Sequence, residues 1–149
     1  MQSAGILMYR KKAEVEVLLV HPGGPFFVKK DLGSWSIPKG EYLSGEDPLL
    51  VAIREFEEET GAVVNGEFVP LGSVKQKGGK EVTAWAFEGD LNESEIVSNT
   101  FEIEWPPRSG KMSTFPEVDK AGWFTLDQAK LKLNERQAAF LARLEELLG

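Results

Sequence analysis

The hydrophobic positions in the first forty residues predict two strands followed by an irregular segment. Ala4 to Tyr9 and Val15 to His21 are short, mainly apolar runs separated by charged residues, which indicates two strands joined by a turn. The segment from Phe26 to Gly40 mixes glycine and proline with aromatic and basic residues. We therefore expect a loop there, with one short strand around Trp35 to Ile37.

The next segment carries the start and stop signals of a helix. Asp47 is suited to cap its first turn, Pro48 suits the first helical position, and Gly61 suits the residue after its end. Between these signals, apolar residues recur at helical spacing and predict a face that packs on a sheet. These residues are Leu49, Ala52, Ile53 and Phe56.

The middle of the chain predicts a hairpin, a further strand and a long loop. Glu67 to Gln76 and Lys80 to Glu88 flank a pair of glycines that can adopt the positive φ of a hairpin turn. Thr100 to Trp105 is another candidate strand. Pro106 to Pro116 contains three prolines and few core-forming residues, so we expect a long ordered loop of the kind that often carries function.

The C-terminal segment predicts a closing helix over a single domain. Asp127 to Lys132 indicates a short helical turn, and Asn134 can cap a longer helix from Glu135 to Leu148. Strands around one central helix, closed by another, indicate an α+β fold, an α/β/α sandwich with a mixed sheet over residues 1–149. One face of the closing helix is expected to pack on the sheet: Phe140, Leu144, Leu147 and Leu148.

The charge and composition of the chain limit the kinds of partner that it is expected to bind. The formal net charge is -7, which argues against nucleic acid as a partner, because binding to a phosphate backbone rests on clustered Lys and Arg. An acidic protein that handles phosphates needs metal ions instead. The chain has no cysteine, which excludes disulfides and thiolate sites. With neither a targeting segment nor an apolar run of about 20 residues, we expect a cytoplasmic protein without membrane contact.

Three glutamates of the predicted central helix are the strongest candidates for chemistry. Glu55, Glu58 and Glu59 are three and four residues apart and so share one face, where their charges repel each other unless a cation lies between them. Mg²⁺ and Mn²⁺ prefer such carboxylate oxygens. For an arbitrary helix rich in glutamate, a solvated surface would be the favoured interpretation.

The residues around these glutamates favour the metal-binding interpretation. Over 23 residues they follow the order Gly, five residues, Glu, seven residues, Arg-Glu-apolar-any-Glu-Glu-any-Gly-apolar, which resembles the Nudix box. The preceding strands, the following hairpin and the closing helix also look like the Nudix arrangement. The matching positions are Gly40, Glu46, Arg54, Glu55, Phe56, Glu58, Glu59, Gly61 and Ala62.

The resemblance implies a metal-dependent hydrolase that acts on phosphorus-containing anhydrides, with Mg²⁺ or Mn²⁺ as cofactor. In the Nudix family the carboxylates of the box bind divalent ions that activate water and neutralise the diphosphate. Carried onto this chain, the metal ligands are Glu55, Glu58 and Glu59, with the Gly40 carbonyl as a further ligand.

The resemblance also implies roles for other acidic and basic residues. Glu46 and Arg54 are expected to fix the loop before the helix through a charge-assisted contact. Glu55 and Glu58 count among the catalytic residues, and a box glutamate such as Glu58 could be the general base. Glu117 is the preferred candidate from a downstream loop. Glu102 and Glu104 compete with it.

Substrate contacts are predicted in two places. The run from Trp35 to Gly40 looks like the Trp-any-any-Pro-Lys-Gly run of Nudix members that hydrolyse dinucleoside polyphosphates, and a similar run occurs in members that act on diphosphoinositol polyphosphates. Lys39 would then face the phosphates, and Trp35 would contact the substrate. Arg108 and Lys111 in the long loop could clamp distal phosphates, although solvated loop charges explain them equally well.

Several functions remain open from the sequence. The leading one is hydrolysis of a diphosphate linkage in a small nucleoside polyphosphate, with a dinucleoside polyphosphate as first candidate. Within the enzyme class, the alternative substrates are ADP-ribose, another nucleotide sugar, or a nucleoside triphosphate that the enzyme would remove in a sanitising role. From another class, a Nudix-fold sensor that binds nucleotide without turnover is possible, because function resides in the site. The sequence leaves open a monomer or a homodimer.

Overall fold

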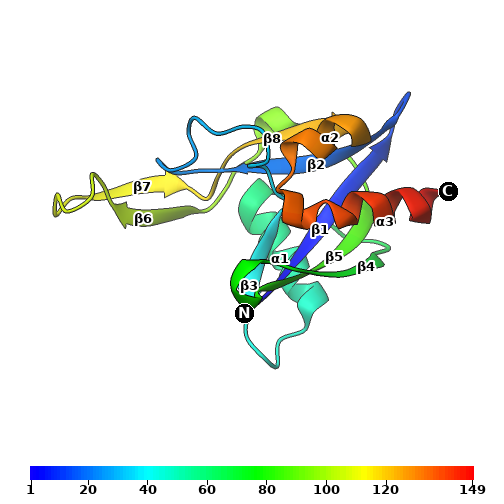
Figure 1. Ribbon diagram of the computed structural model, residues 1–149, viewed down its shortest axis with the longest axis horizontal. Helices are drawn as coiled ribbons and strands as arrows, with labels where there is room; N and C mark the ends of the chain where they lie inside the picture. The colour runs from blue at the N-terminus through cyan, green and yellow to red at the C-terminus, as the bar shows by residue number, and fades with distance from the viewer.

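A mixed sheet of six strands forms the centre of the computed structural model, which describes residues 1–149 (Figure 1). β5 runs parallel to β1, and every other neighbouring pair in the sheet is antiparallel. The strands in spatial order are β4 (Val69–Lys75), β5 (Glu81–Glu88), β1 (Gln2–Lys11), β2 (Val15–Pro22) and β8 (Val118–Thr125), with β3 (Lys39–Tyr42) beside β1.

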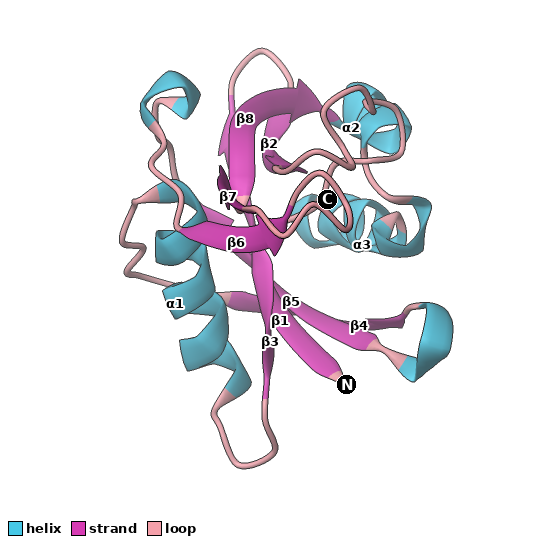
Figure 2. Cartoon of the chain, turned by 90° about the vertical axis from the view of Figure 1, so that its left-hand side faces the viewer, coloured by secondary structure: helices cyan, strands magenta, loops and turns pink.

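One edge of β1 is shared by two different strands. Its first residues pair with β3, from Gln2 opposite Tyr42 to Gly5 opposite Lys39, whereas its last residues pair with β2. Between the two, the backbone N–H of Ile6 donates to the carbonyl of Pro38 at 3.1 Å. This arrangement places β3, which contains Lys39 and Gly40, beside the first half of β1 and next to α1 (Figure 2).

Helices cover both faces of the sheet, so the predicted α/β/α sandwich is confirmed. Ile6 and Met8 of β1 are buried in the cluster that contains α1 (Pro48–Thr60), while Leu7 lies in the cluster with α2 and α3. Alternate residues of a strand point to opposite faces, which explains this division. The two other helices are α2 (Leu126–Lys132) and α3 (Ala139–Leu148).

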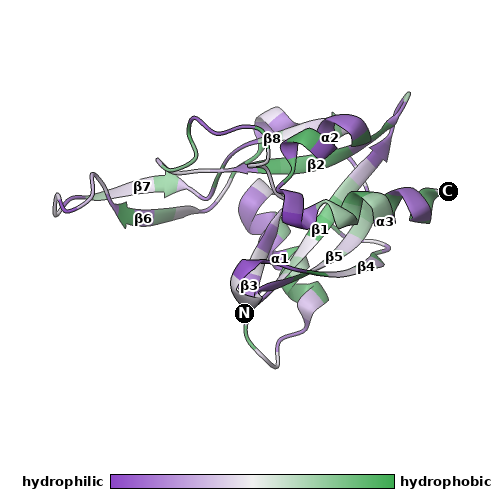
Figure 3. Cartoon of the chain, in the orientation of Figure 1, coloured by the Kyte–Doolittle hydropathy of each residue, from purple (hydrophilic) through white to green (hydrophobic).

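Hydrophobic residues are concentrated where these layers meet. Figure 3 shows them along β1, β2 and α3, with hydrophilic residues dominating the ends and loops. Phe140 and Leu144 of α3 are fully buried, and Leu148 packs against the same cluster, whereas Leu147 is 42% exposed. No helix of the chain has both the length and the apolar composition needed to cross a membrane.

A separate hairpin projects from the sandwich and corrects one prediction. β6 (Thr100–Glu104) pairs with β7 (Met112–Pro116), and Phe101 lies opposite Phe115 (Figure 1). The second half of the predicted loop is therefore a strand. Its prolines suggested a loop, but Pro116 is the last residue of β7, where a missing N–H does not interrupt the ladder.

Four other elements differ from the sequence-based prediction. Strands β3 and β8 were not predicted, because β3 is only four residues long and β8 carries charged residues in its first half. Trp35 and Ser36 form isolated bridges rather than a strand. The closing helix begins at Ala139, after a 3-10 turn at Glu135–Gln137 that Asn134 caps as predicted.

Candidate metal and active site

Helix α1 presents the candidate carboxylates from a rigid position. Its N-terminus is capped by Asp47, whose side chain accepts a hydrogen bond from the N–H of Leu49, and Gly61 ends it with a φ of 82°. Ala52 and Phe56 are fully buried under the sheet. These features fix the rotation of the helix, and with it the direction of its acidic face.

Gly40 of β3 lies directly against the carboxyl group of Glu55. A Cβ atom on Gly40 would be 2.0 Å from the carboxyl carbon of Glu55, which is far below any real contact distance. Only glycine is compatible with this close approach of backbone and carboxylate. The contact explains why a glycine stands 15 positions before Glu55 in the motif, and it brings the Gly40 backbone next to the predicted metal ligands.

The carboxylates raise one another's pKa values. Burial raises the pKa of Glu55 to about 7, and a hydrogen bond with Glu58 and the charge of Glu58 add to the effect. Burial also raises the pKa of Glu59 to about 8, with a further contribution from Glu55 and an opposing one from Lys39. The pKa of Glu117 is raised by burial and then by Glu58. The nearby cations Arg54 and Lys39 thus only partly offset the repulsion, and the carboxylates keep their protons to a higher pH than usual.

The residues present fit a divalent cation. Atom Oε2 of Glu55 is buried and has no hydrogen-bond partner, which is costly for a carboxylate oxygen unless something cationic satisfies it. No three acidic or histidine side chains of the chain already enclose a common point as a complete ligand set. Mg²⁺ does not need one, since it typically binds one or two carboxylates and keeps several waters.

Glu117 reaches the same site through backbone contacts that tie three segments together. Its N–H donates to the carbonyl of Asn99 at 2.8 Å, and the N–H of Asn99 donates to the carbonyl of Glu58 at 2.7 Å. Its own carbonyl accepts from the N–H of Gly23 at 2.9 Å. A Cβ on Gly23 would come within 1.9 Å of the Pro116 carbonyl oxygen, so this crossing also requires glycine.

A small cavity lies between Glu59 of α1 and Glu117. It has a volume of about 150 Å³, and its polar lining includes Lys39, Glu59, Glu117 and Ser36. Lys39 is therefore placed beside the acidic cluster, where its ammonium can meet a phosphate that is held against the carboxylates. Lys39 and Glu117 are the residues that the sequence predicts here, whereas Asn99 and Gly23 carry no sequence signal because they contribute only backbone atoms.

Glu46 and Arg54 lie in contact at the loop before α1. Nη1 of Arg54 is 3.4 Å from Oε2 of Glu46, and the N–H of Leu43 donates to the other carboxylate oxygen at 2.9 Å. The hydrogen bond from Leu43, and then Arg54, lower the pKa of Glu46. Arg54 also lies 3.9 Å from the carboxylate of Glu58, so it links the loop to the acidic face.

Trp35 is placed differently from the prediction. It is only 5% exposed and belongs to the core cluster on the α3 side, and its ring N–H donates to Asp31 at 2.8 Å. A buried ring that packs edge-on against His21 and Phe124 offers no open face for a base. Trp35 is therefore a core residue, and its predicted contact with substrate is not supported.

Arg108 and Lys111, the predicted basic clamp, also lie away from the acidic cluster. Arg108 and Lys111 are exposed and lie at the tip of the β6–β7 hairpin, which projects away from α1 (Figure 1). Glu104 accepts a hydrogen bond from the N–H of Arg108 at 2.9 Å, so it stabilises the hairpin turn. Glu102 is exposed on β6. Neither competitor of Glu117 shares its cavity.

The family of the chain follows from this fold and from a direct match. The model of a family described as the NUDIX domain matches residues 1–144. The chain therefore belongs to the Nudix family, as the motif between Gly40 and Ala62 predicted.

Two curated relatives are similar over part of their length. Nudix hydrolase 25 of Arabidopsis thaliana is 41% identical over 61 residues, which is 39% of this chain and 34% of the relative. The RNA pyrophosphohydrolase of Rhodospirillum rubrum is 42% identical over 62 residues, 40% of this chain and 36% of the relative. The matched segment thus spans about a third of each relative.

Solved structures share the whole fold. A binary complex of the C. elegans Ap4A hydrolase has a TM-score of 0.67 and 22% identity, covering 98% of this chain and 97% of that chain. The NUDIX domain of Shewanella oneidensis NrtR, complexed with ADP ribose, has a TM-score of 0.67 and 16% identity, covering 100% and 88%. At these identities the likeness establishes the fold alone.

Proposed function

We propose that this protein is a metal-dependent pyrophosphohydrolase that cleaves a diphosphate linkage in a nucleoside polyphosphate. The observation that carries the proposal is the buried carboxylate oxygen Oε2 of Glu55, which has no partner within a cluster of four mutually repelling glutamates. Such a cluster is destabilising unless a cation and its ligands occupy it.

Glu55, Glu58 and Glu59 would hold Mg²⁺ or Mn²⁺, and the Gly40 carbonyl is adjacent to them. When bound, the ion neutralises phosphate charge and lowers the pKa of a coordinated water. The chain itself positions the carboxylates through α1 and provides Lys39 to orient a phosphate beside them. Arg54 balances part of the charge of Glu58 from outside the cluster.

Glu117 is the proposed general base. Its pKa is raised by burial and by Glu58, which suits a group that accepts a proton from water near neutral pH. It lines the same cavity as Glu59 and Lys39. Glu58 remains the alternative base, since it lies beside both Glu55 and Glu117.

A dinucleoside polyphosphate is the first candidate substrate. The run from Trp35 to Gly40 supports it, with Lys39 beside the carboxylates, and a structural neighbour is an Ap4A hydrolase. ADP-ribose, nucleotide sugars and nucleoside triphosphates are the alternatives, and another neighbour is complexed with ADP ribose. We place the reaction in the cytoplasm, consistent with a chain that lacks cysteine.

A second candidate is the diphosphate at the 5′ end of RNA. The partial match to an RNA pyrophosphohydrolase favours it. The net charge of -7 opposes it, because a protein of that charge gains little affinity from an RNA backbone.

The test is a hydrolysis panel with Mg²⁺ and with chelator. It contains diadenosine polyphosphates, nucleoside triphosphates, ADP-ribose, nucleotide sugars, diphosphoinositol polyphosphates and a 5′-triphosphorylated RNA, with products separated by chromatography. We expect metal-dependent cleavage, fastest with a diadenosine polyphosphate. Thermal stabilisation by a nucleotide without turnover of any compound would contradict the proposal and favour a sensor.

A further inference from the structure

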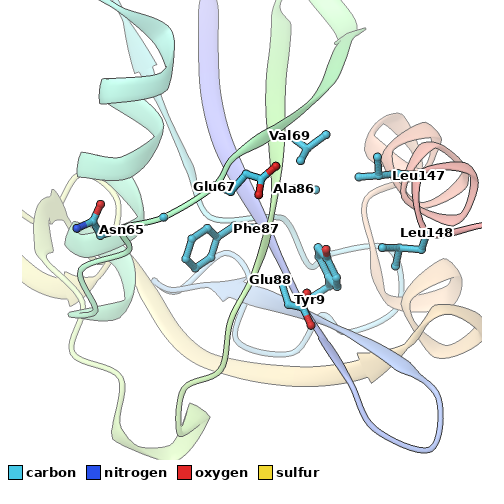
Figure 4. A pocket seen from close by; sticks show the side chains of 10 residues that line it. Tyr9, Asn65, Glu67, Val69, Ala86, Phe87, Glu88, Leu147 and Leu148 are labelled. Carbon is cyan, nitrogen blue, oxygen red and sulfur yellow. The ribbon is translucent and has the colours of Figure 1, made fainter.

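A second concave surface lies at the opposite end of β1 from the carboxylate cluster. This groove has a volume of about 420 Å³ and is formed by the ends of β1 and β5, the segment before β4, and the last turn of α3 (Figure 4). Tyr9, in the groove, pairs with Glu88, whereas Gly40 of the metal site pairs with Ala4. Five residues of strand separate the two positions, roughly 17 Å.

The groove contains the hydroxyl group of Tyr9. Tyr9 is only 8% exposed, and its hydroxyl points into the space between β5 and α3 (Figure 4). Burial raises the pKa of this hydroxyl, and Glu88 and Glu67 raise it further, while no hydrogen bond from the protein contributes. The hydroxyl forms no hydrogen bond within the chain and opens into the groove, so it is available to a ligand there.

The charge of the groove is one-sided. Glu67 and Glu88 are both exposed at its rim, none of the lining residues is basic, and neither glutamate takes part in a salt bridge of the chain. The walls between them are apolar, and they include Val69, Leu147 and Leu148. The exposed side chain of Leu147 is thereby explained as a groove wall.

We propose that this groove binds a small organic cation, an ammonium group carried on an apolar chain. The carboxylates of Glu67 and Glu88 attract the charge, the hydroxyl of Tyr9 is available to accept a hydrogen bond from the ammonium, and Leu147 and Leu148 cover the alkyl chain. An anion, such as a nucleotide phosphate, is disfavoured by the same charges. The site is thus distinct in both place and chemistry from the one that handles phosphates.

The experiment uses three probes of equal chain length: hexylamine, hexanol and hexanoate. Binding is followed by amide chemical shifts of the full-length protein in saturating Mg²⁺, so that the carboxylates of α1 do not compete for the amine. We expect hexylamine to shift the amides of Glu67, Phe87 and Leu148 saturably, with hexanol at least several-fold weaker and hexanoate without effect.

Variants locate the interaction. Replacing both glutamates, as Glu67→Gln with Glu88→Gln, should weaken hexylamine binding roughly tenfold, and Tyr9→Phe should weaken it a few-fold. Glu14→Gln, on the exposed turn between β1 and β2, is the matched control and should leave binding unchanged. A free amine and a lysine side chain share this chemistry, so a comparison of hexylamine with N-acetyl-lysine methylamide identifies which of them binds more tightly.

Three results would overturn the proposal. Equal binding of hexanol and hexylamine would mean that the groove recognises only apolar surface. Shifts confined to residues of α1, or unchanged binding in the double glutamine variant, would show that the amine does not occupy the groove.

Discussion

Two groups of carboxylates in this molecule lie in opposite electrostatic surroundings. At one end of β1, Arg10 donates to Glu16 at 2.7 Å and to Asp90 at 2.9 Å, and its guanidinium lies 4.1 Å from the ring centre of Trp123. The hydrogen bond from Arg10 lowers the pKa of Asp90. There each carboxylate is matched by a cation that the chain supplies.

In the acidic cluster of α1 the pKa values move the other way. Glu55 and Glu59 have pKa values raised to about 7 and about 8, and the nearby cations Arg54 and Lys39 only partly offset the effect. Carboxylates matched by the protein's own cations stabilise a fold, whereas unmatched carboxylates either retain protons or bind a cation from outside. The carboxylates around Arg10 therefore have a structural role, whereas those of α1 are candidates for a functional one.

The largest effect is expected from a metal ligand. Glu58→Gln removes charge from the cluster with little change in volume, and it should reduce kcat by roughly 10³-fold, equivalent to about 4 kcal/mol of transition-state stabilisation. Steady-state kinetics of the preferred substrate measure it. Glu57→Gln, one residue away on the exposed side of α1, is the matched control and should behave like the wild type. Wild-type activity in Glu58→Gln would refute its assignment as a metal ligand.

Removing the proposed base should have a slightly smaller effect. Glu117→Gln is expected to lower kcat about 10²-fold with little change in KM, because the group acts in proton transfer rather than in binding. The acidic limb of the pH–rate profile should also change. Glu102→Gln is the control and should leave kcat close to that of the wild type. A larger fall in kcat for Glu102→Gln than for Glu117→Gln would make Glu102 the better candidate for the general base.

Metal binding should stabilise the protein in a pH-dependent way. Between pH 4.5 and about 8 the folded state retains protons on Glu55 and Glu59 that the unfolded chain releases, so the stability of the metal-free protein falls as pH rises through this window. Mg²⁺ binding should displace these protons and restore the stability that the metal-free protein loses as pH rises. At a hundredfold excess over Kd it should add about 2.7 kcal/mol.

Calorimetry with and without Mg²⁺ measures this effect. The rise in Tm should be larger near about pH 8.5 than near about pH 6, since fewer protons compete with the metal at the higher pH. In Glu59→Gln the metal-free Tm at the higher pH should increase, because a buried charge is gone, and the response to Mg²⁺ should shrink. An equal rise at both pH values would contradict the raised pKa values.

Arg10→Ala tests the group in which Arg10 binds the carboxylates of Glu16 and Asp90. It should lower the free energy of unfolding by about 1–2 kcal/mol through the lost hydrogen bonds and the lost contact with Trp123. The value of kcat should stay within error of the wild type. Urea unfolding with parallel kinetics checks both, and a large fall in kcat would show that the two regions are not separable.

The smallest effect is expected at the hairpin tip. Arg108→Ala, alone or with Lys111→Ala, should raise KM only a few-fold and leave kcat unchanged, because the tip projects from the sandwich and could meet only the distal end of a long substrate. A change in kcat would instead indicate that the hairpin closes over the site during turnover.

Most of the fold could be predicted because its elements carry local signals. Asp47, Pro48 and Gly61 bound α1 at the predicted positions, and the paired glycines mark the turn between β4 and β5. β8 lacks such a signal, since Asp119, Lys120 and Gly122 interrupt its apolar pattern and tertiary pairing with β2 decides its structure.

The same limit applies to the site. The carboxylates of α1 could be predicted because helical spacing alone puts them on one face. The burial of Trp35 and the backbone bridge through Asn99 depend on segments that meet only in the folded state. Sequence spacing contains no information on such contacts, so it predicts neither the burial of Trp35 nor the role of Asn99.

The most direct test of the central claim is a titration of the wild-type protein with Mg²⁺ in weakly buffered solution near pH 7, with binding and proton release followed together. If the unmatched glutamates are the metal ligands, saturable binding should release roughly one to two protons per chain, and the release should fall toward zero as the pH is raised above the pKa of Glu59. Binding without proton release, or no saturable binding, would contradict the claim.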